Sequence, residues 1–174
     1  MCYSVRVAVD SQAFKDVMAQ FASGVTVVTT QLNGQHFGLT VSAFTSLSLD
    51  PPLVLICLDK KVHAHGIIEQ SKVFAVNILR SDQVEVGIRF AGLRPEIQDR
   101  FEGMTCATGV TGSPILPNCL GWIDCNLWER YDGGDHTIFV GEVLASCLTG
   151  SAGPLLYHNR AWHGSTTLDV IVPS

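Results

Sequence analysis

Strand-like segments joined by short turns run through most of this sequence and restrict it to a mainly β fold. The run PPLVLICL at 51–58 is continuously apolar, which is typical of a buried strand. NGQ at 33–35 and DGGD at 132–135 have the composition of hairpin turns. Further strands are predicted at 24–30, 36–43, 72–79, 120–131, 136–148 and 155–162. About seven strands with hairpin turns and no βαβ alternation predict a closed or nearly closed barrel.

Helical periodicity interrupts this pattern in three places. The clearest is 11–22, where Asp10 or Ser11 can cap the start and one face is apolar. That face is made of Phe14, Val17, Met18 and Phe21. A short, weak helix is predicted at 64–71, and a better one at 81–92, with Ser81 as its cap and Gly92 as its stop.

Length and composition set the class of protein. The chain has 174 residues, which predicts a single domain over 1–174 with a core from about 11 to 165. A net charge of -5 disfavours nucleic acid as a partner, and no apolar run approaches the roughly 20 residues of a membrane helix. The first ten residues do not resemble a signal peptide. The six cysteines form no C-x-x-C pair, so we expect reduced thiols and a cytoplasmic location.

Hydroxyl-rich residues at 40–48 stand directly before the most apolar strand. Small side chains let a ligand approach the backbone, and free N–H groups with hydroxyls can hold a phosphate. Lys60 and Lys61 follow the apolar strand and add positive charge. The alternative is an ordinary polar crossover on the surface of a barrel. Signatures of Rossmann dehydrogenases, P-loop enzymes, α/β-hydrolases and zincins are missing from the sequence.

Five stretches carry a family resemblance that extends from about Phe14 to Trp162. They are FASGVTVVTT (21–30), GLTVSAFTSLSLDPPLVLICLDK (38–60), FAVNIL (74–79), GDHTIFVGEV (134–143) and PLLYHNRAW (154–162). In this order they resemble the flavin reductase-like family, the short-chain NAD(P)H:flavin oxidoreductases that serve two-component flavin monooxygenases. The resemblance implies an FMN-binding split barrel with a few helices, a homodimer, and flavin bound near the subunit interface.

The resemblance also implies which residues form the site. His136 would lie nearest the nicotinamide, and Tyr157 is a weaker match. The flavin-contacting positions would be Thr30, Thr40, Val41, Ser42, Ala43, Ser46, Leu58, Asp59, Lys60, Lys61, Phe90 and Ala91. Asp59 departs from the family pattern, because a carboxylate near a phosphate is unfavourable unless it points away. No metal is implied.

The implied activity is hydride transfer from NADH or NADPH to FMN or FAD, with the reduced flavin passing to a partner monooxygenase. Such a transfer needs two rings held in near contact and no protein nucleophile. A carrier or sensor that binds flavin without reducing it stays open as an alternative. The small-residue segment SAFTS at 42–46 and the turn GDH at 134–136 disfavour a pyridoxamine-phosphate-oxidase-like barrel. The H-x-H pair His63 and His65 reads as a solvated turn rather than a metal site, and Asn77 as a structural amide.

Overall fold

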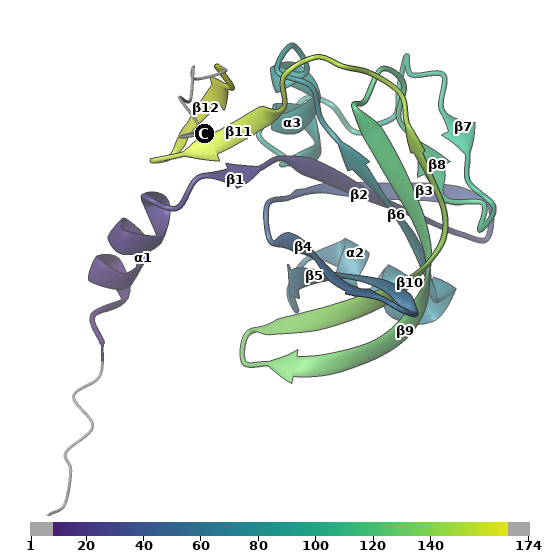
Figure 1. The fold of residues 1–174 in the computed structure, drawn as a ribbon, viewed down its shortest axis with the longest axis horizontal. Coiled ribbons are helices and arrows are strands. Elements are labelled where there is room, and N and C mark those ends of the chain that lie inside the picture. Colours follow the sequence, from purple (N-terminus) through teal and green to yellow (C-terminus); the bar gives the residue numbers. More distant parts are fainter. Residues whose placement is uncertain (1–8, 167–174) are drawn as a thin grey trace, which may run out of the picture.

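The computed structural model describes residues 9–166, and its largest element is a seven-stranded antiparallel sheet (Figure 1). The strand order is β3-β2-β6-β9-β10-β5-β4. The strands are β2 (Thr26–Leu32), β3 (Gln35–Val41), β4 (Phe44–Leu49), β5 (Pro52–Asp59), β6 (Val73–Ile78), β9 (Gly121–Gly133) and β10 (His136–Leu148). The mainly β prediction is therefore confirmed.

The sheet is not closed into a true barrel, so of the two predicted forms, closed and nearly closed, the fully closed one is not what the structure shows. Closure would require β3 to pair with β4, the two edge strands. Only Ser42 and Ala43 connect them, and this short connection turns β4 onto β5 instead. The hydroxyl-rich segment at 40–48, for which a polar crossover was the alternative, contains most of strand β4. A polar sequence forms a strand here because β4 is an edge that is largely exposed.

Five shorter strands lie outside this sheet. β1 (Ser23–Gly24), β11 (Leu155–His158) and β12 (Ala161–Gly164) form one small sheet, and β7 (Ala107–Thr108) pairs with β8 (Pro114–Ile115). The segment 155–162, predicted as one strand, is thus a hairpin. Its turn places Asn159 and Arg160 at φ 46° and 61°, and asparagine adopts this left-handed region more readily than most residues.

Three helices complete the described fold: α1 (Ser11–Ala19), α2 (His63–Ser71) and α3 (Val84–Phe90). α1 starts as predicted, with the Asp10 carboxylate accepting from the Ala13 N–H at 2.8 Å, but it ends before Ala22 because Ser23 joins β1. The Ser81 cap prediction is wrong. The residue before α3 is Gln83, with no side-chain cap bond, and the Ser81 N–H donates to the Gly153 carbonyl at 2.9 Å.

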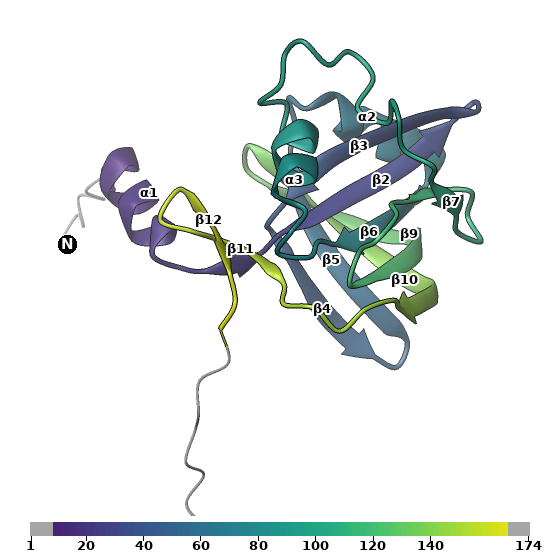
Figure 2. The same cartoon turned by 90° about the horizontal axis from the view of Figure 1, so that it is seen from above.

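α1 stands apart from the main sheet and contacts the β11–β12 turn instead (Figures 1 and 2). The Asn159 N–H donates to the Ala19 carbonyl at 2.7 Å, and Arg160 pairs with Asp16 at 2.5 Å. The apolar stripe of α1 therefore has no sheet beneath it. Its four residues are 49–71% exposed: Phe14, Val17, Met18 and Phe21.

The hydrophobic core has two clusters. One packs inside the main sheet around Ile56, Phe74 and Phe139, and the other lies beneath α3 and β11 around Phe90 and Leu155. Asn77 sits within the sheet with every polar side-chain atom bonded, which confirms the structural-amide prediction. Its Nδ2 donates to the Val27 carbonyl and to the Thr29 hydroxyl, both at 3.1 Å, and its Oδ1 accepts from the Leu116 N–H at 2.8 Å.

The described cysteines differ sharply in environment, and this predicts their order of alkylation. Burial raises the pKa of Cys119 to about 11 and that of Cys125 to about 12, whereas Cys147 is exposed. Because the thiolate is the nucleophile, iodoacetamide should modify Cys147 in the native protein and reach Cys119 and Cys125 only after unfolding. Peptide mapping by mass spectrometry measures this order. Modification of Cys125 as fast as Cys147 would contradict the observed packing.

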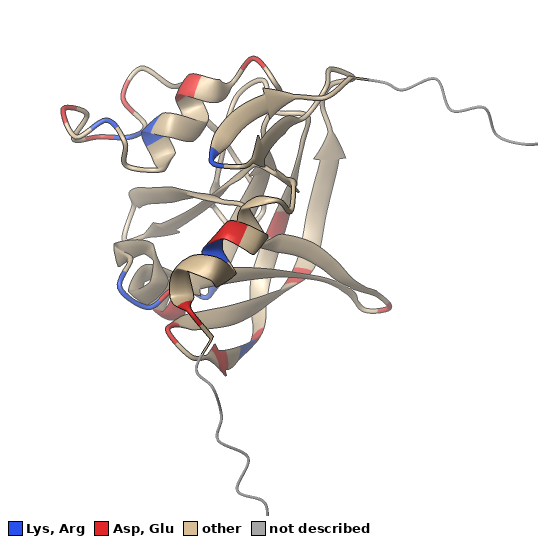
Figure 3. Ribbon diagram, turned by 90° about the vertical axis from the view of Figure 1, so that its left-hand side faces the viewer, with Lys and Arg blue, Asp and Glu red and all other residues tan. Residues whose placement is uncertain are grey.

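Charged residues lie mainly on helices, turns and loops, with both signs intermixed on the described surface (Figure 3). Among residues 9–166, no helix is long and apolar enough to cross a membrane.

Candidate functional site

Three neighbouring strands bring several predicted site residues to one end of the main sheet. β5 ends at Asp59, which is opposite His136 at the start of β10. The Ala43 carbonyl, just before β4, accepts from the Cys57 N–H at 3.0 Å. Strand spacings of about 4.8 Å and a rise of about 3.3 Å per residue place Ala43 and His136 roughly 12 Å apart. The hydroxyl-rich segment and the GDH turn, distant in sequence, therefore border one region.

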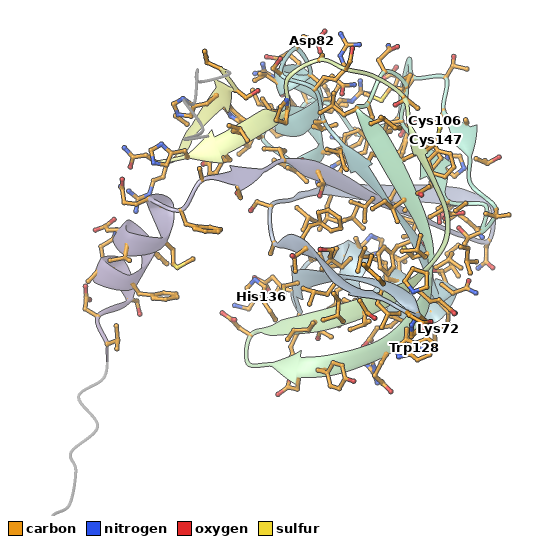
Figure 4. The ribbon with its side chains drawn as sticks, in the orientation of Figure 1. Lys72, Asp82, Cys106, Trp128, His136 and Cys147 are labelled. Atoms are coloured by element: carbon orange, nitrogen blue, oxygen red, sulfur yellow. The ribbon has the colours of Figure 1, made fainter. Side chains whose placement is uncertain are left out.

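The His136 side chain lies at the start of β10 and is 45% exposed (Figure 4). Its Nδ1 lies 2.7 Å from Asp135 Oδ1, and this contact lowers the pKa of the Asp135 carboxyl. With Nδ1–H donating to the carboxylate, a neutral imidazole keeps Nε2 as an acceptor. The histidine is held in orientation while its ring stays accessible.

The segment at the end of β5, residues 59–61, is stabilised by hydrogen bonds from its own side chains. Asp59 Oδ1 accepts from the Lys61 N–H at 2.8 Å, so the carboxylate is committed to a local turn. The Lys60 ammonium contacts Asp132 and the Gly134 carbonyl on the β9–β10 hairpin. This accounts for the unusual carboxylate at position 59, because it stabilises the backbone here.

The segment 40–43 separates two cavities. Ser42 and Ala43 line a cavity of about 610 Å³ on the side of α1, here named the α1 cavity. Its wall includes the apolar side chains of Phe14 and Met18, together with Tyr157 from β11. Val41, between Thr40 and Ser42 in the chain, is buried.

The second cavity, here named the β3 cavity, has a volume of about 580 Å³. It is lined by residues 36–40 of β3, 62–64 at the start of α2, 90–91 at the end of α3, and 98–101 of the following loop. Of the predicted residues it includes Thr40, Phe90 and Ala91. The Thr40 hydroxyl donates to the Gly87 carbonyl at 2.7 Å, which ties β3 to α3.

Other predicted residues lie away from both cavities. Leu58 is in the core, and Thr30 is 1% exposed, with its hydroxyl donating to the Val73 carbonyl at 2.7 Å. Ser46 is exposed on β4 and lines neither cavity. Sequence reasoning did not assign the cavity-lining residues Phe14, Met18, His36, Phe37, His63, Arg100 and Phe101 to the site. The apolar stripe on α1 was the one sequence signal for any of these residues, because an apolar helix face is expected to pack against another surface.

A third cavity, of about 760 Å³, lies elsewhere, and its wall contains none of the predicted site residues. Arg80 and Asp82 on its wall are paired with each other at 2.6 Å. Within residues 9–166, no group of three or more His, Cys, Asp or Glu side chains is arranged to hold a metal ion.

Comparisons with known proteins identify the family. Residues 18–166 match the model of the flavin reductase like domain. The chain belongs to the flavin reductase-like family. It is 38% identical over 157 residues to the flavin-dependent monooxygenase reductase subunit HsaB of Rhodococcus jostii (strain RHA1), covering 90% of this chain and 79% of HsaB.

Solved structures of flavin reductases share the fold. Nitrilotriacetate monooxygenase component B from Mycobacterium thermoresistibile superposes with a TM-score of 0.86 at 38% identity, covering 91% of this chain and 88% of that one. The NADH:FAD oxidoreductase SgcE6 of Streptomyces globisporus, solved with NAD and FAD fragments, superposes with a TM-score of 0.84 at 32% identity, covering 92% and 94%.

The residues of this flavin reductase-like chain fit a flat ring with polar edges. Position 42 is serine and position 43 is alanine, both exposed, so side chains leave the backbone there accessible. Gly38, in the β3 cavity, instead packs closely against the protein's own ring, because an added Cβ would lie 2.7 Å from Phe90 Cε1. Small residues and apolar walls together favour an aromatic ligand held against the main chain.

The prediction of a solvated H-x-H turn is wrong for His65. This side chain is buried in α2, with Nε2 2.8 Å from the Thr137 hydroxyl and its ring packed edge-to-face on Phe139 at 5.1 Å. Glu69, one turn later, lies 4.0 Å from Nδ1 and pairs with Arg130. His65 therefore joins α2 to β10 at the residue next to His136.

His65 should make stability depend on pH. Burial, then Arg130, then Lys60 lower its pKa, so the folded protein favours the neutral ring. Unfolded histidine protonates near pH 6.5, so this stability is fully present above about pH 6.5 and decreases as the pH falls toward the lower folded value. His65→Gln keeps a hydrogen-bonding group but does not titrate. Thermal melts should show that the Tm falls less between pH 8 and pH 5.5 for this variant than for wild type. An equal fall in both proteins would contradict the proposed role of His65 in the pH dependence.

Proposed function

We propose that this chain is an NAD(P)H-dependent flavin reductase that transfers a hydride from NADH to FMN or FAD and supplies reduced flavin to a partner monooxygenase. The observation that carries the proposal is the meeting of Ser42–Ala43, Asp59–Lys61 and His136 at one end of the sheet, in a chain of this family. The monooxygenase partner is inferred from relatives such as HsaB, a reductase subunit.

The chain's residues divide the binding work among several elements. Thr40 to Ala43 contact the ring through their backbone, and Ser46 lies on the phosphate side. Asp59, Lys60 and Lys61 follow the ribityl chain and phosphate, and Phe90 and Ala91 add a second phosphate-side contact. Thr30 and Leu58, being buried, support the site through packing. When bound, flavin supplies the ring that accepts a hydride from the reduced nicotinamide.

His136 is the residue proposed to orient the nicotinamide. Its ring is accessible, and the bond to Asp135 fixes its position. Positioning of this kind, rather than a protein nucleophile, is what hydride transfer between two rings requires.

A homodimer is part of the proposal, because the stripe on α1 is apolar and exposed. A second copy of this chain would cover it, as the resemblance to the family implies. Val17 is 70% exposed and does not line the α1 cavity, so Val17→Glu should convert the dimer to a monomer. Size-exclusion chromatography with light scattering measures the mass. Ser11→Glu, at the start of the same helix, is the control and should stay dimeric, and a monomeric wild type would refute the dimer.

The deciding experiment is NADH oxidation by the purified protein, followed by the loss of NADH absorbance with and without FMN or FAD. Rapid oxidation that requires added flavin supports a reductase with exchangeable flavin, and NADPH in a parallel assay ranks the two nucleotides. Clear flavin binding without turnover would refute the reductase and favour a carrier or sensor. A cytoplasmic location stays a prediction from the cysteine pattern.

A further inference from the structure

The turn directly before His136 has little structure of its own. Residues 132–135 end the β9–β10 hairpin, are all exposed, and include two consecutive glycines, Gly133 and Gly134. Gly134 has a φ of 80°, a conformation that glycine adopts readily. The hairpin projects from the main sheet at this turn (Figure 1). An exposed turn with few packing contacts opens easily, so it needs contacts from outside the hairpin to hold His136 in one place.

A single lysine supplies those contacts. β5 stops opposite His136, so the turn has no paired strand beside it. Just past the end of β5, the Lys60 N–H donates to the Asp135 carbonyl at 3.0 Å. The Lys60 ammonium contacts the Asp132 carboxylate and the Gly134 carbonyl. Lys60 therefore contacts three of the four turn residues, from a segment more than seventy residues earlier in the chain.

The charges around this contact are complementary. The bond from Lys60 lowers the pKa of the Asp132 carboxyl, so the carboxylate is charged and attracts the ammonium at neutral pH. Within residues 9–166, the side-chain hydrogen bonds of Lys60 all go to the hairpin. The neighbouring Asp59 carboxylate does not compete for the ammonium, because it accepts from the Lys61 N–H at 2.8 Å.

These contacts lead to His136 through Asp135. The Asp135 carbonyl accepts from the Lys60 N–H, and its carboxylate lies 2.7 Å from His136 Nδ1. Asp135 can orient the histidine ring only if its own position is fixed. The Lys60 ammonium fixes the turn in which Asp135 lies, so it acts on the ring at one remove.

Lys60 also lies on the proposed path of the ribityl chain, which gives its ammonium two alternative partners. It could bind the flavin phosphate, or it could hold the hairpin. Reaching the phosphate would require it to leave the Asp132 carboxylate and the Gly134 carbonyl. The structure favours the hairpin, because both contacts are formed without any ligand.

We infer that Lys60 is a positioning residue for hydride transfer: its ammonium holds the β9–β10 turn so that Asp135 keeps the His136 ring in place for the nicotinamide. The inference rests on the proposed function, which gives His136 its role. It assigns the Lys60 ammonium to the hairpin rather than to the phosphate, and it makes Asp132 a second positioning residue.

The first test removes each charge and then exchanges the two. Lys60→Met and Asp132→Asn should each lower kcat/KM for NADH roughly three- to fivefold, the range for an exposed ion pair, and leave the flavin Kd within about twofold. The double variant Lys60→Glu/Asp132→Lys should recover most of this loss. If the ammonium bound the phosphate instead, Lys60→Met would weaken flavin binding, Asp132→Asn would not, and the exchange would not recover activity. That result would overturn the inference.

The second test asks whether Lys60 acts through His136. In a His136→Ala background, Lys60→Met should lower kcat/KM no further, whereas an independent role would add its full loss and contradict the inference. Arg94→Met is the matched control and should keep wild-type kinetics. It breaks the Arg94–Glu85 ion pair, whose side chains are 41% and 73% exposed, against 40% and 78% for Lys60 and Asp132.

Hydrogen–deuterium exchange tests the hairpin contact without turnover. Amides at 133–136 should exchange roughly three- to fivefold faster in Lys60→Met than in wild type, with the Tm unchanged. Unchanged exchange would overturn the inference. Failure of the proposed function would appear separately, as wild type that does not oxidise NADH with any flavin. That result would remove the role in hydride transfer, while faster exchange would still show that Lys60 holds the turn.

Discussion

Ala43→Trp is expected to lower flavin-dependent NADH oxidation about a hundredfold while leaving the thermal unfolding transition near that of wild type. Ala43 is exposed and lines the α1 cavity beside Met18 and Tyr157. An indole at this position would occupy the space that small residues leave open, and misfit of this kind costs about 3 kcal/mol, or roughly a hundredfold. Flavin fluorescence quenching should show the same loss of affinity.

The matched control is Leu49→Trp. Leu49 is 94% exposed at the end of β4 and lines neither cavity. This variant adds the same side chain to the same strand region and should keep wild-type activity. If Ala43→Trp retained full activity and flavin affinity, the ring would have to bind elsewhere, and the proposed placement would be rejected.

Gly141→Ala should cause a large loss of stability for so small a substitution. Gly141 lies on β10 at a register shift with β9. An added Cβ would lie 2.4 Å from Phe74 Cζ and 2.8 Å from Cys125 Cβ, and both side chains are fully buried. Overpacking of this kind costs about 3 kcal/mol, which corresponds to a fall in Tm of roughly 6–12 °C. Differential scanning calorimetry measures the change.

Gly66→Ala is the control for this prediction. Gly66 lies inside α2, and an added Cβ would meet nothing within 4 Å. Because alanine favours the helix, this variant should gain about 0.5–1 kcal/mol. The same chemical change should thus have opposite signs at the two positions. A Gly141→Ala protein that melts at the wild-type temperature would mean that β10 packs less tightly on Phe74.

Strands with strong local patterns could be predicted from the sequence. The apolar run of β5 and the alternating segments of β9 and β10 are recognisable in the sequence. Side chains on a strand alternate between the two faces of the sheet, so burial of one face gives a pattern with a period of two residues. β4 was harder to recognise, because an edge strand needs only one partner and tolerates hydroxyl side chains. The β11–β12 hairpin was missed because Asn159–Arg160 contains no glycine to mark the turn.

The candidate site was predictable only where family motifs cover it. His136 and the segment 40–43 were identified through resemblance, and their roles stay predictions. His36, Arg100 and Phe101 line the β3 cavity from segments about sixty residues apart, and no local pattern links them. His65 was misread for the same reason, since H-x-H spacing does not show that Thr137 and Phe139 will bury one of the rings.

The sequence by itself determined the family, the mainly β architecture, the strong strands and the apolar face of α1, because each depends on local order or on motifs. Only the tertiary structure decided that the sheet stays open, that segment 40–43 separates two cavities, and that Asp59 faces His136. These features depend on register and on contacts between distant segments. The free energies that select them come from packing and hydrogen bonds that form only when the whole sheet assembles.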